Sequence, residues 1–165
     1  SSSPWNMYDL LKEFLDLNNI PEGPLLLRDF GLQENKFFSS GHSGHKTKEI
    51  NNILKTFPQL NFILIGDSGQ QDIFIYTEIA IQNPKRILAI YIRDLELTKT
   101  SEKVNAQIEK AKALGIEIIL GKNALIISEH AATNGYIFTD AIPEIKKDKK
   151  EDTGEIVGKV EDEIL

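Results

Sequence analysis

Residues 61–72 read Asn-Phe-Ile-Leu-Ile-Gly-Asp-Ser-Gly-Gln-Gln-Asp, an apolar run followed by a polar turn that contains two glycines. A short continuous apolar run that ends at a turn is typical of a strand buried on both faces, as in a parallel sheet. Open parallel sheets bind ligands just beyond the carboxyl ends of their strands. Asp67 and Asp72 are therefore expected at the place where such a fold binds its ligand.

Helical and strand patterns alternate on both sides of this stretch. The spacing of apolar residues, with Pro, Asn and Gly at the breaks, predicts helices over 5–17, 45–57, 73–82, 101–114 and 123–133. It predicts strands over 25–27, 60–65, 86–92 and 116–120. Such alternation indicates an α/β class, a Rossmann-like parallel sheet with helices on both faces and right-handed crossovers.

Composition limits the kind of protein. The chain has 165 residues, 41% of them hydrophobic and 27% charged, which is typical of one globular domain. A net charge of -6 argues against a general nucleic-acid binder, and the absence of cysteine excludes disulfides and thiolate metal sites. No apolar segment reaches the roughly 20 residues that span a bilayer.

The domain prediction has two parts. Residues 1–145 are expected to form one α/β domain, and residues 146–165, rich in Lys, Asp and Glu, to form a charged, solvated tail. The chain opens on Ser1-Ser-Ser-Pro-Trp5 without an initiator methionine or a leader peptide. We therefore expect it to be a piece of a longer protein whose sheet begins upstream.

Two interpretations of Asp67 and Asp72 stay open from the residues alone. Two carboxylates five residues apart across a strand-to-helix turn can converge on a hard cation such as Mg²⁺, which commonly takes one or two carboxylates together with phosphate and water. Alternatively, Asp67 caps the following helix and Asp72 lies in its first turn, where a negative charge is stabilising.

Four further side chains are candidates for phosphate contact. Lys46 begins the helix that leads into the Asp67 strand, so its ammonium can neutralise a phosphate, or simply be solvated. Ser1 and Ser3 can offer hydroxyl groups to a phosphate or cap the first helix. Arg93, expected at the end of the 86–92 strand, can touch an anionic substrate or pair with a nearby carboxylate.

Several motifs resemble those of one known family. The 62–72 string, Tyr76 and the segment Ile90-Tyr-Ile-Arg93 are similar to the actin-patch phosphatidate phosphatases, a family of the haloacid dehalogenase superfamily. The opening Ser-Ser-Ser-Pro-Trp resembles the family's Ser-x-Ser-Pro-Trp segment, and His45-Lys46 its His-Lys segment. The resemblance extends over roughly residues 1–141.

The resemblance implies a mechanism and a set of roles. Phosphate transfers to an aspartate nucleophile in an Asp-x-Asp-x-Thr segment, and water hydrolyses the aspartyl phosphate. By the same resemblance, Ser1 and Ser3 bind phosphate, Lys46 holds phosphate and nucleophile, and Asp67 and Asp72 bind Mg²⁺. The catalytic residues it implies within this chain are Ser1 and Lys46.

The sequence departs from the family pattern at the nucleophile. It contains no Asp-x-Asp, so the nucleophile, the general acid and one metal ligand are expected upstream of Ser1. This chain alone is expected to be nearly inactive, because catalytic residues act as a unit and the absence of one of them removes most of the activity.

The resulting functional prediction is a Mg²⁺-dependent phosphatidate phosphatase. We expect it in the cytoplasm, with peripheral membrane contact and no nucleic-acid partner. One alternative is a phosphatase of the same superfamily that acts on a soluble phosphate ester. Another is a non-catalytic module that binds a phosphorylated ligand or a protein. The sequence upstream of Ser1 discriminates between enzyme and binding module.

Overall fold

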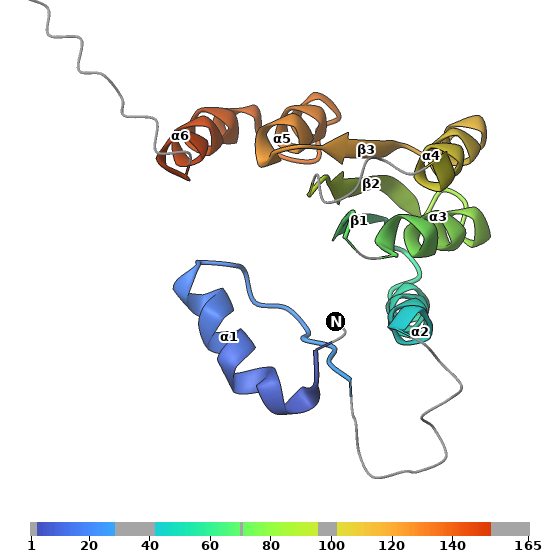
Figure 1. Cartoon of the computed structure of the whole chain (residues 1–165), viewed down its shortest axis with the longest axis horizontal. Helices are drawn as coiled ribbons and strands as arrows, with labels where there is room; N and C mark the ends of the chain where they lie inside the picture. The colour runs from blue at the N-terminus through green and yellow to red at the C-terminus, as the bar shows by residue number, and fades with distance from the viewer. Residues whose placement is uncertain (1–2, 29–41, 70, 96–101, 153–165) are drawn as a thin grey trace, which may run out of the picture. The chain divides into compact units, whose positions relative to one another are not determined.

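The computed structural model describes residues 3–28, 42–69, 71–95 and 102–152. The chain divides into two compact units, Ser1–Asn61 and Phe62–Leu165. Figure 1 shows the helices and strands of each. No helix in the described ranges is both long and apolar enough to cross a membrane.

The first unit contains a 3-10 turn, η1 (Trp5–Met7), and the helices α1 (Tyr8–Leu17) and α2 (His42–Thr56). The predicted first helix is confirmed, but Ser3 does not cap it. Pro4 occupies the cap position in an extended conformation, and the Ser3 carbonyl accepts a hydrogen bond from the Arg28 amide at 2.9 Å.

The strand predicted over residues 25–27 is absent. Its segment forms an isolated bridge between Pro4 and Arg28, closed by the Trp5 amide and the Arg28 carbonyl at 2.8 Å. A strand needs a ladder of backbone partners, and one residue pair does not provide it. The helix α2 begins at His42, three residues before the start predicted from the sequence.

The second unit is an α/β arrangement of the predicted class (Figure 1). Its elements are β1 (Phe62–Asp67), α3 (Asp72–Gln82), β2 (Ile87–Arg93), α4 (Glu102–Ala113), β3 (Ile118–Gly121), α5 (Ala124–Thr133), η2 (Thr139–Ala141) and α6 (Ile142–Asp152). The strands are parallel in the order β1-β2-β3. Each connection between neighbouring strands passes through a helix, the usual form of the crossover that parallel pairing requires.

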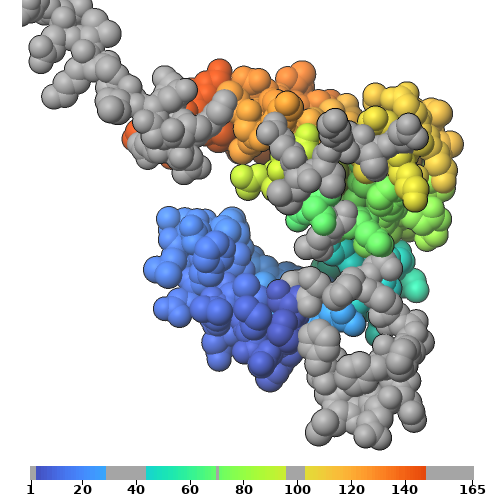
Figure 2. Space-filling view, in the orientation of Figure 1, coloured from blue at the N-terminus to red at the C-terminus, as the bar shows by residue number. Residues whose placement is uncertain are grey.

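Helices cover both faces of this sheet. Gly66 of β1 lies against Asp72 and Tyr76 of α3, whereas Tyr91 of β2 packs with Ala131 of α5. Gly66 pairs with Ile92, the residue next to Tyr91, and successive residues of a strand point to opposite faces. The helices α3 and α5 therefore lie on opposite faces of the sheet. Figure 2 shows the elements from β1 to α5 as one continuous packed mass.

Burial on both faces is confirmed for β2 and wrong for β1. Ile90, Tyr91 and Ile92 of β2 are 0%, 2% and 0% exposed, but Ile65 of β1 is 69% exposed. The reason is position in the sheet. β2 has a strand on each side, whereas β1 is an edge strand in the described sheet, and the cluster around α5 reaches Ile63 of β1 but leaves Ile65 uncovered.

Tyr91 anchors α5 to the sheet through a chain of hydrogen bonds. Its hydroxyl lies 3.0 Å from Nδ1 of His130, and Nε2 of His130 lies 2.9 Å from a carboxylate oxygen of Glu117. The two rings meet edge to face, with centroids 5.7 Å apart. Burial raises the pKa of Tyr91 to about 12, with further contributions from Tyr136 and Glu117. Tyr91 is therefore a neutral hydrogen-bonding group at physiological pH.

Residues 146–152, assigned from the sequence to a charged tail, continue the helix α6. Lys146 of this helix approaches Glu129 of α5 at 3.5 Å. The segment has too few apolar residues to show a helical pattern. Its contact with α5 joins residues distant in the chain and is not visible in the local sequence. The rest of the predicted tail, from residue 153, lies outside the described residues.

Candidate functional site

Asp67 ends β1 and is held by its own turn. Its Oδ1 accepts a hydrogen bond from the Gly69 amide at 2.9 Å, which closes a tight turn between residues 67 and 69. The side chain is half-buried, and within the described part of the chain its Oδ2 makes no hydrogen bond. One carboxylate oxygen is thus fixed, and the other remains available at the carboxyl end of a parallel strand.

Asp72 begins α3 and is only 3% exposed. Its Oδ2 accepts a hydrogen bond from the Asp67 amide at 3.4 Å, so the two predicted aspartates are brought together. A negative charge in the first turn of a helix is also stabilised by the helix dipole. The capping interpretation is right for Asp72, which lies in the first turn of α3, and wrong for Asp67, because the helix is capped at Gln71 and Asp67 Oδ1 accepts from the Gly69 amide instead. The part of Asp72 in binding a metal stays a prediction.

Gly66 makes this packing possible. A Cβ at residue 66 would overlap the Asp72 carboxylate and come within 2.8 Å of the Tyr76 ring. Atoms that are not bonded do not approach so closely without a shift of the backbone or of the side chains. The glycine before Asp67 therefore allows β1 and α3 to pack closely.

Tyr76 of α3 helps to fix the end of β1, the strand that carries Asp67. Its hydroxyl donates to the Ile65 carbonyl at 3.1 Å. Burial raises the pKa of Tyr76 strongly, and the negative charges of Asp72 and Asp67 raise it further. Tyr76 consequently stays protonated and acts as a donor, which ties α3 to the strand that carries Asp67.

A brace through Ser68 connects the ends of β1 and β2. The Ser68 amide donates to the Arg93 carbonyl at 2.9 Å, and Ser68 Oγ accepts from the Leu95 amide at 3.0 Å. The same Oγ lies 3.5 Å from Oδ1 of Asp94, at the limit of hydrogen bonding. These contacts extend the pairing of the two strands past their last residues and fix the turn that carries Asp67.

Sequence reasoning missed the roles of Ser68 and Asp94. They are 26 residues apart, and only the register of β1 with β2 brings them together. The signal that could have found them is the placement of both directly after consecutive parallel strands, whose carboxyl ends lie at one edge of the sheet.

The predicted site residues belong to both units of the chain. Lys46 lies in α2 and Ser3 precedes η1, both in the first unit, whereas Asp67 and Asp72 belong to the second. Ser1 lies outside the described residues. The roles implied for these three residues therefore stay predictions.

The donor set at β1 fits a hard cation in part. Among the described residues there is no group of three or more His, Asp or Glu side chains placed to hold a metal. Asp67 nevertheless offers a carboxylate oxygen that bonds none of the described residues, beside the buried carboxylate of Asp72. Oxygen donors of this kind suit Mg²⁺, which accepts one or two carboxylates and completes its shell with phosphate and water.

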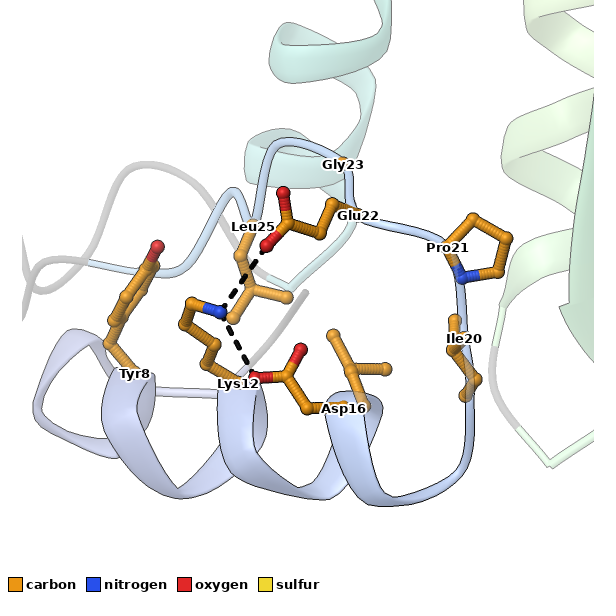
Figure 3. A pocket seen from close by; sticks show the side chains of 9 residues that line it. Tyr8, Lys12, Asp16, Ile20, Pro21, Glu22, Gly23 and Leu25 are labelled. Atoms are coloured by element: carbon orange, nitrogen blue, oxygen red, sulfur yellow. Dashed lines mark hydrogen bonds and ion pairs between the residues drawn. The ribbon is translucent and has the colours of Figure 1, made fainter.

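A separate pocket of about 430 Å³ lies within the first unit, between α1 and the segment that follows it. Figure 3 shows Lys12 of α1 at its rim, bonded to Asp16 at 3.0 Å and to Glu22 at 3.5 Å. Hydrogen bonding to Asp16, followed by its charge and by Glu22, raises the pKa of Lys12. None of the residues proposed for chemistry lines this pocket.

Comparison with known proteins identifies relatives over the first part of the chain. Residues 1–94 match the family model described as phosphatidate phosphatase APP1, catalytic domain. The phosphatidate phosphatase APP1 of Saccharomyces cerevisiae is 44% identical over 96 residues, which is 56% of this chain and 16% of the yeast protein. An uncharacterized protein of Schizosaccharomyces pombe is 34% identical over 97 residues, 58% of this chain and 16% of that protein.

The match ends near the carboxyl end of β2, earlier than the 1–141 span expected from the motifs. No solved structure matches the chain. The chain spans about one sixth of the length of these two curated relatives, 16% of each. The matched part contains Lys46, Asp67, Asp72 and the Ser68 brace as far as Asp94. On this match, the chain belongs to the family of phosphatidate phosphatase APP1 catalytic domains.

Proposed function

We propose that the protein containing this chain is a Mg²⁺-dependent phosphatase that hydrolyses the phosphomonoester of phosphatidate. One observation carries the proposal: the fixed turn at the carboxyl end of β1 presents a carboxylate oxygen of Asp67 that makes no hydrogen bond within the described residues. The substrate class follows from the activity for which the yeast relative is named, phosphatidate phosphatase; that relative is 44% identical over 96 residues. The location expected for a lipid substrate is the cytoplasm, at a membrane surface.

The residues of the chain divide the work as follows. Asp67 would hold the cation through Oδ2, the oxygen that the Gly69 amide does not bond. Asp72 adds a second carboxylate beside it, whose Oδ2 accepts a hydrogen bond from the Asp67 amide. Lys46 and the hydroxyl groups of Ser1 and Ser3 bind the phosphate oxygens. Mg²⁺, when bound, supplies positive charge that polarises the phosphoryl group and aligns it. Tyr76, protonated, keeps the strand and α3 in register through its bond to the Ile65 carbonyl.

The nucleophile is proposed to come from outside these 165 residues. In haloacid dehalogenase-type phosphatases an aspartate attacks phosphorus, the alcohol leaves, and water then releases phosphate from the aspartyl phosphate. The chain contains no Asp-x-Asp segment that could supply this aspartate. In the described sheet the outer edge of β1 has no partner strand, and Ile65 on that strand is 69% exposed. A further strand beside β1 would cover this edge and bring its own carboxyl end next to Asp67.

A non-catalytic binding module is the alternative that a specific observation favours. No group of three metal-binding side chains exists among the described residues, and no Asp-x-Asp exists in the sequence. A protein without the nucleophile would bind a phosphorylated ligand without turnover. A phosphatase for a soluble ester differs from the main proposal only in its substrate.

The test is phosphate release by the full-length protein with and without Mg²⁺. The substrates are phosphatidate in detergent micelles and glycerol phosphate as a soluble ester. Removing the proposed metal ligand with Asp67→Asn should lower kcat by about a hundredfold or more. Asp140→Asn, an exposed aspartate in η2, is the matched control and should behave as wild type.

Three outcomes separate the candidates. Mg²⁺-dependent release from phosphatidate that Asp67→Asn abolishes supports the main proposal. Faster release from the soluble ester supports the second substrate class. A folded full-length protein that releases phosphate from neither substrate contradicts a phosphatase and leaves the binding module.

A further inference from the structure

Arg93 stands beside Asp67 at the carboxyl edge of the sheet. The register of β1 and β2 pairs Asp67 with Arg93. Residues in register on neighbouring parallel strands lie on the same face, and the strands are about 4.8 Å apart. The guanidinium and the proposed metal ligand therefore rise from adjacent positions on one face.

Arg93 is not engaged in an ion pair in the described part of the chain. Its side chain is exposed, and the aspartate that follows it in sequence, Asp94, is turned toward Ser68 at 3.5 Å. On the other side, the register partner of Arg93 is Gly121 of β3, which has no side chain to bond it. Among the described neighbours, the Asp94 carboxylate is thus directed toward Ser68, and Gly121 has no group that could neutralise the arginine.

The backbone of Arg93 is nevertheless fixed. Its carbonyl accepts the Ser68 amide at 2.9 Å, and the amide of the next residue, Asp94, donates to the Gly121 carbonyl at 2.9 Å. The three strand ends are therefore tied together on both sides of Arg93. A side chain on a fixed backbone, with its charged head free, loses little freedom of the main chain when it binds a ligand.

The chemistry of the guanidinium points to the phosphate. Arginine presents parallel N–H groups that match two oxygens of a phosphate and stays charged at every physiological pH. Next to a cation held by Asp67, a phosphomonoester dianion would lie within reach of the adjacent strand position. We propose that Arg93 is a binding residue for the anionic phosphate of the substrate, an inference that rests on the proposed function of the Asp67 corner.

The shared ligand chemistry, a phosphate dianion, can come from the lipid headgroup or from free inorganic phosphate. Two variants in the full-length protein distinguish a role of the guanidinium from a general charge effect: Arg93→Gln and Arg93→Lys. Arg86, just before the opposite end of the same strand, gives the matched control Arg86→Gln. Arg86 precedes the amino end of β2, whereas Arg93 is the last residue of the strand, at its carboxyl end.

The first readout is steady-state hydrolysis of phosphatidate and of glycerol phosphate. Arg93→Gln should raise KM for both substrates by about tenfold, the usual value of one charge-assisted hydrogen bond, with a smaller change in kcat. Arg93→Lys should recover part of the loss, and Arg86→Gln should match wild type. An increase in KM for the lipid alone would mean contact with the lipid surface and would overturn phosphate binding.

The second readout does not require turnover. Titration calorimetry of inorganic phosphate into the Mg²⁺-loaded full-length protein should give a Kd about tenfold weaker for Arg93→Gln than for wild type. Wild-type turnover with unchanged KM and Kd in Arg93→Gln would overturn the inference and leave the proposed function intact. A wild-type protein without turnover would contradict the proposed function, and the phosphate titration would then decide the role of Arg93 alone. If wild type and Arg93→Gln bind phosphate equally, or neither binds it, the inference is wrong.

Discussion

The neighbouring strands β1 and β2 have similar apolar sequences and opposite environments. β2 is the central strand of the described sheet, and its Ile90 and Ile92 are fully buried. β1 is an edge strand of the same sheet, with Ile65 69% exposed. The difference shows that the length of an apolar run reports strand formation, whereas burial depends on what the rest of the protein places beside the strand.

The comparison also separates stability from chemistry. The buried apolar side chains of the second unit lie mainly on β2 and α3, and burial of apolar surface is the main favourable term in folding. The candidate site is concentrated on β1, where Asp67 has a fixed turn and an open oxygen. Changes on the two strands should therefore be measurable as different effects.

The largest expected difference is between two isoleucines. Ile90→Ala should destabilise the second unit by about 2–5 kcal/mol, because it removes a fully buried side chain and leaves a cavity. Ile65→Ala should cost less than about 1 kcal/mol in the same unit, because the side chain is already largely in water. Hydrogen exchange of the β2 amides in the full-length protein measures both. Equal losses would mean that Ile65 is buried by a part of the protein outside the described residues, which would support the proposed additional strand.

The next effect concerns the tightly packed face of β1. Gly66→Ala should destabilise the unit by about 1–3 kcal/mol, because the new methyl group would overlap Asp72 and crowd Tyr76. The same variant should lose phosphatase activity, since the Asp67 turn would move. Gly23→Ala is the control, because a Cβ there meets no atom within 4 Å. Thermal unfolding and phosphate release are the measurements, and an unaltered Gly66→Ala protein would contradict the close packing described here.

A smaller effect is expected at Tyr91, on the buried strand. Tyr91→Phe should cost about 1 kcal/mol, the usual net value of one hydrogen bond, because the bond to His130 is lost. The variant should also change how the free energy of unfolding depends on pH above 10. The folded-state pKa of Tyr91, about 12, lies above the ordinary value of 10.0, so its contribution is complete below pH 10 and is lost as pH rises toward 12.

Stability between pH 10 and 12 should therefore fall less steeply in Tyr91→Phe than in wild type. Circular dichroism across this pH range gives the comparison. Tyr8→Phe is the control, because Tyr8 is 40% exposed and lies in the first unit. Identical alkaline curves for wild type and Tyr91→Phe would show that the phenol is not protected in the folded state.

The smallest effect on stability is expected at the brace between the two strands. Ser68→Ala removes the acceptor of the Leu95 amide and the long contact to Asp94, and should cost less than about 1 kcal/mol because both contacts are only partly buried. Its effect on activity should be larger than this cost implies, because the turn of Asp67 is loosened. Ser128→Ala on α5 is the control for loss of a hydroxyl. A Ser68→Ala enzyme with unchanged kcat and unchanged Mg²⁺ requirement would show that the brace does not position Asp67.

Local patterns predicted much of the fold. The helix α3 and the strand β2 begin and end within about one residue of the predicted ranges, because Pro, Asn and Gly mark the breaks and apolar residues fill the runs. The pairing of Asp67 with Asp72 was also predictable, since both lie on one strand-to-helix turn. These features depend on residues close together in the chain.

The features that the sequence did not reveal depend on distant partners. The exposure of Ile65 is set by the edge position of β1, and the contact of Ser68 with Asp94 by the register between two strands. The helix over residues 146–152 has no apolar pattern of its own, and its contact with α5, through Lys146 and Glu129, is not visible in the local sequence. The strand predicted at 25–27 is absent because the segment lacks distant partners: it has only the single bridge between Pro4 and Arg28.

Binding of Mn²⁺ to the full-length protein, followed by electron paramagnetic resonance and competed with Mg²⁺, tests the central claim most directly. The claim is that the open carboxylate oxygen of Asp67 holds a divalent cation at the carboxyl end of β1. Wild type and Asp140→Asn should bind one Mn²⁺ per chain, displaced by Mg²⁺, with the same affinity. Asp67→Asn should bind Mn²⁺ at least about tenfold more weakly. Equal Mn²⁺ affinity in wild type and in a folded Asp67→Asn protein would contradict the claim.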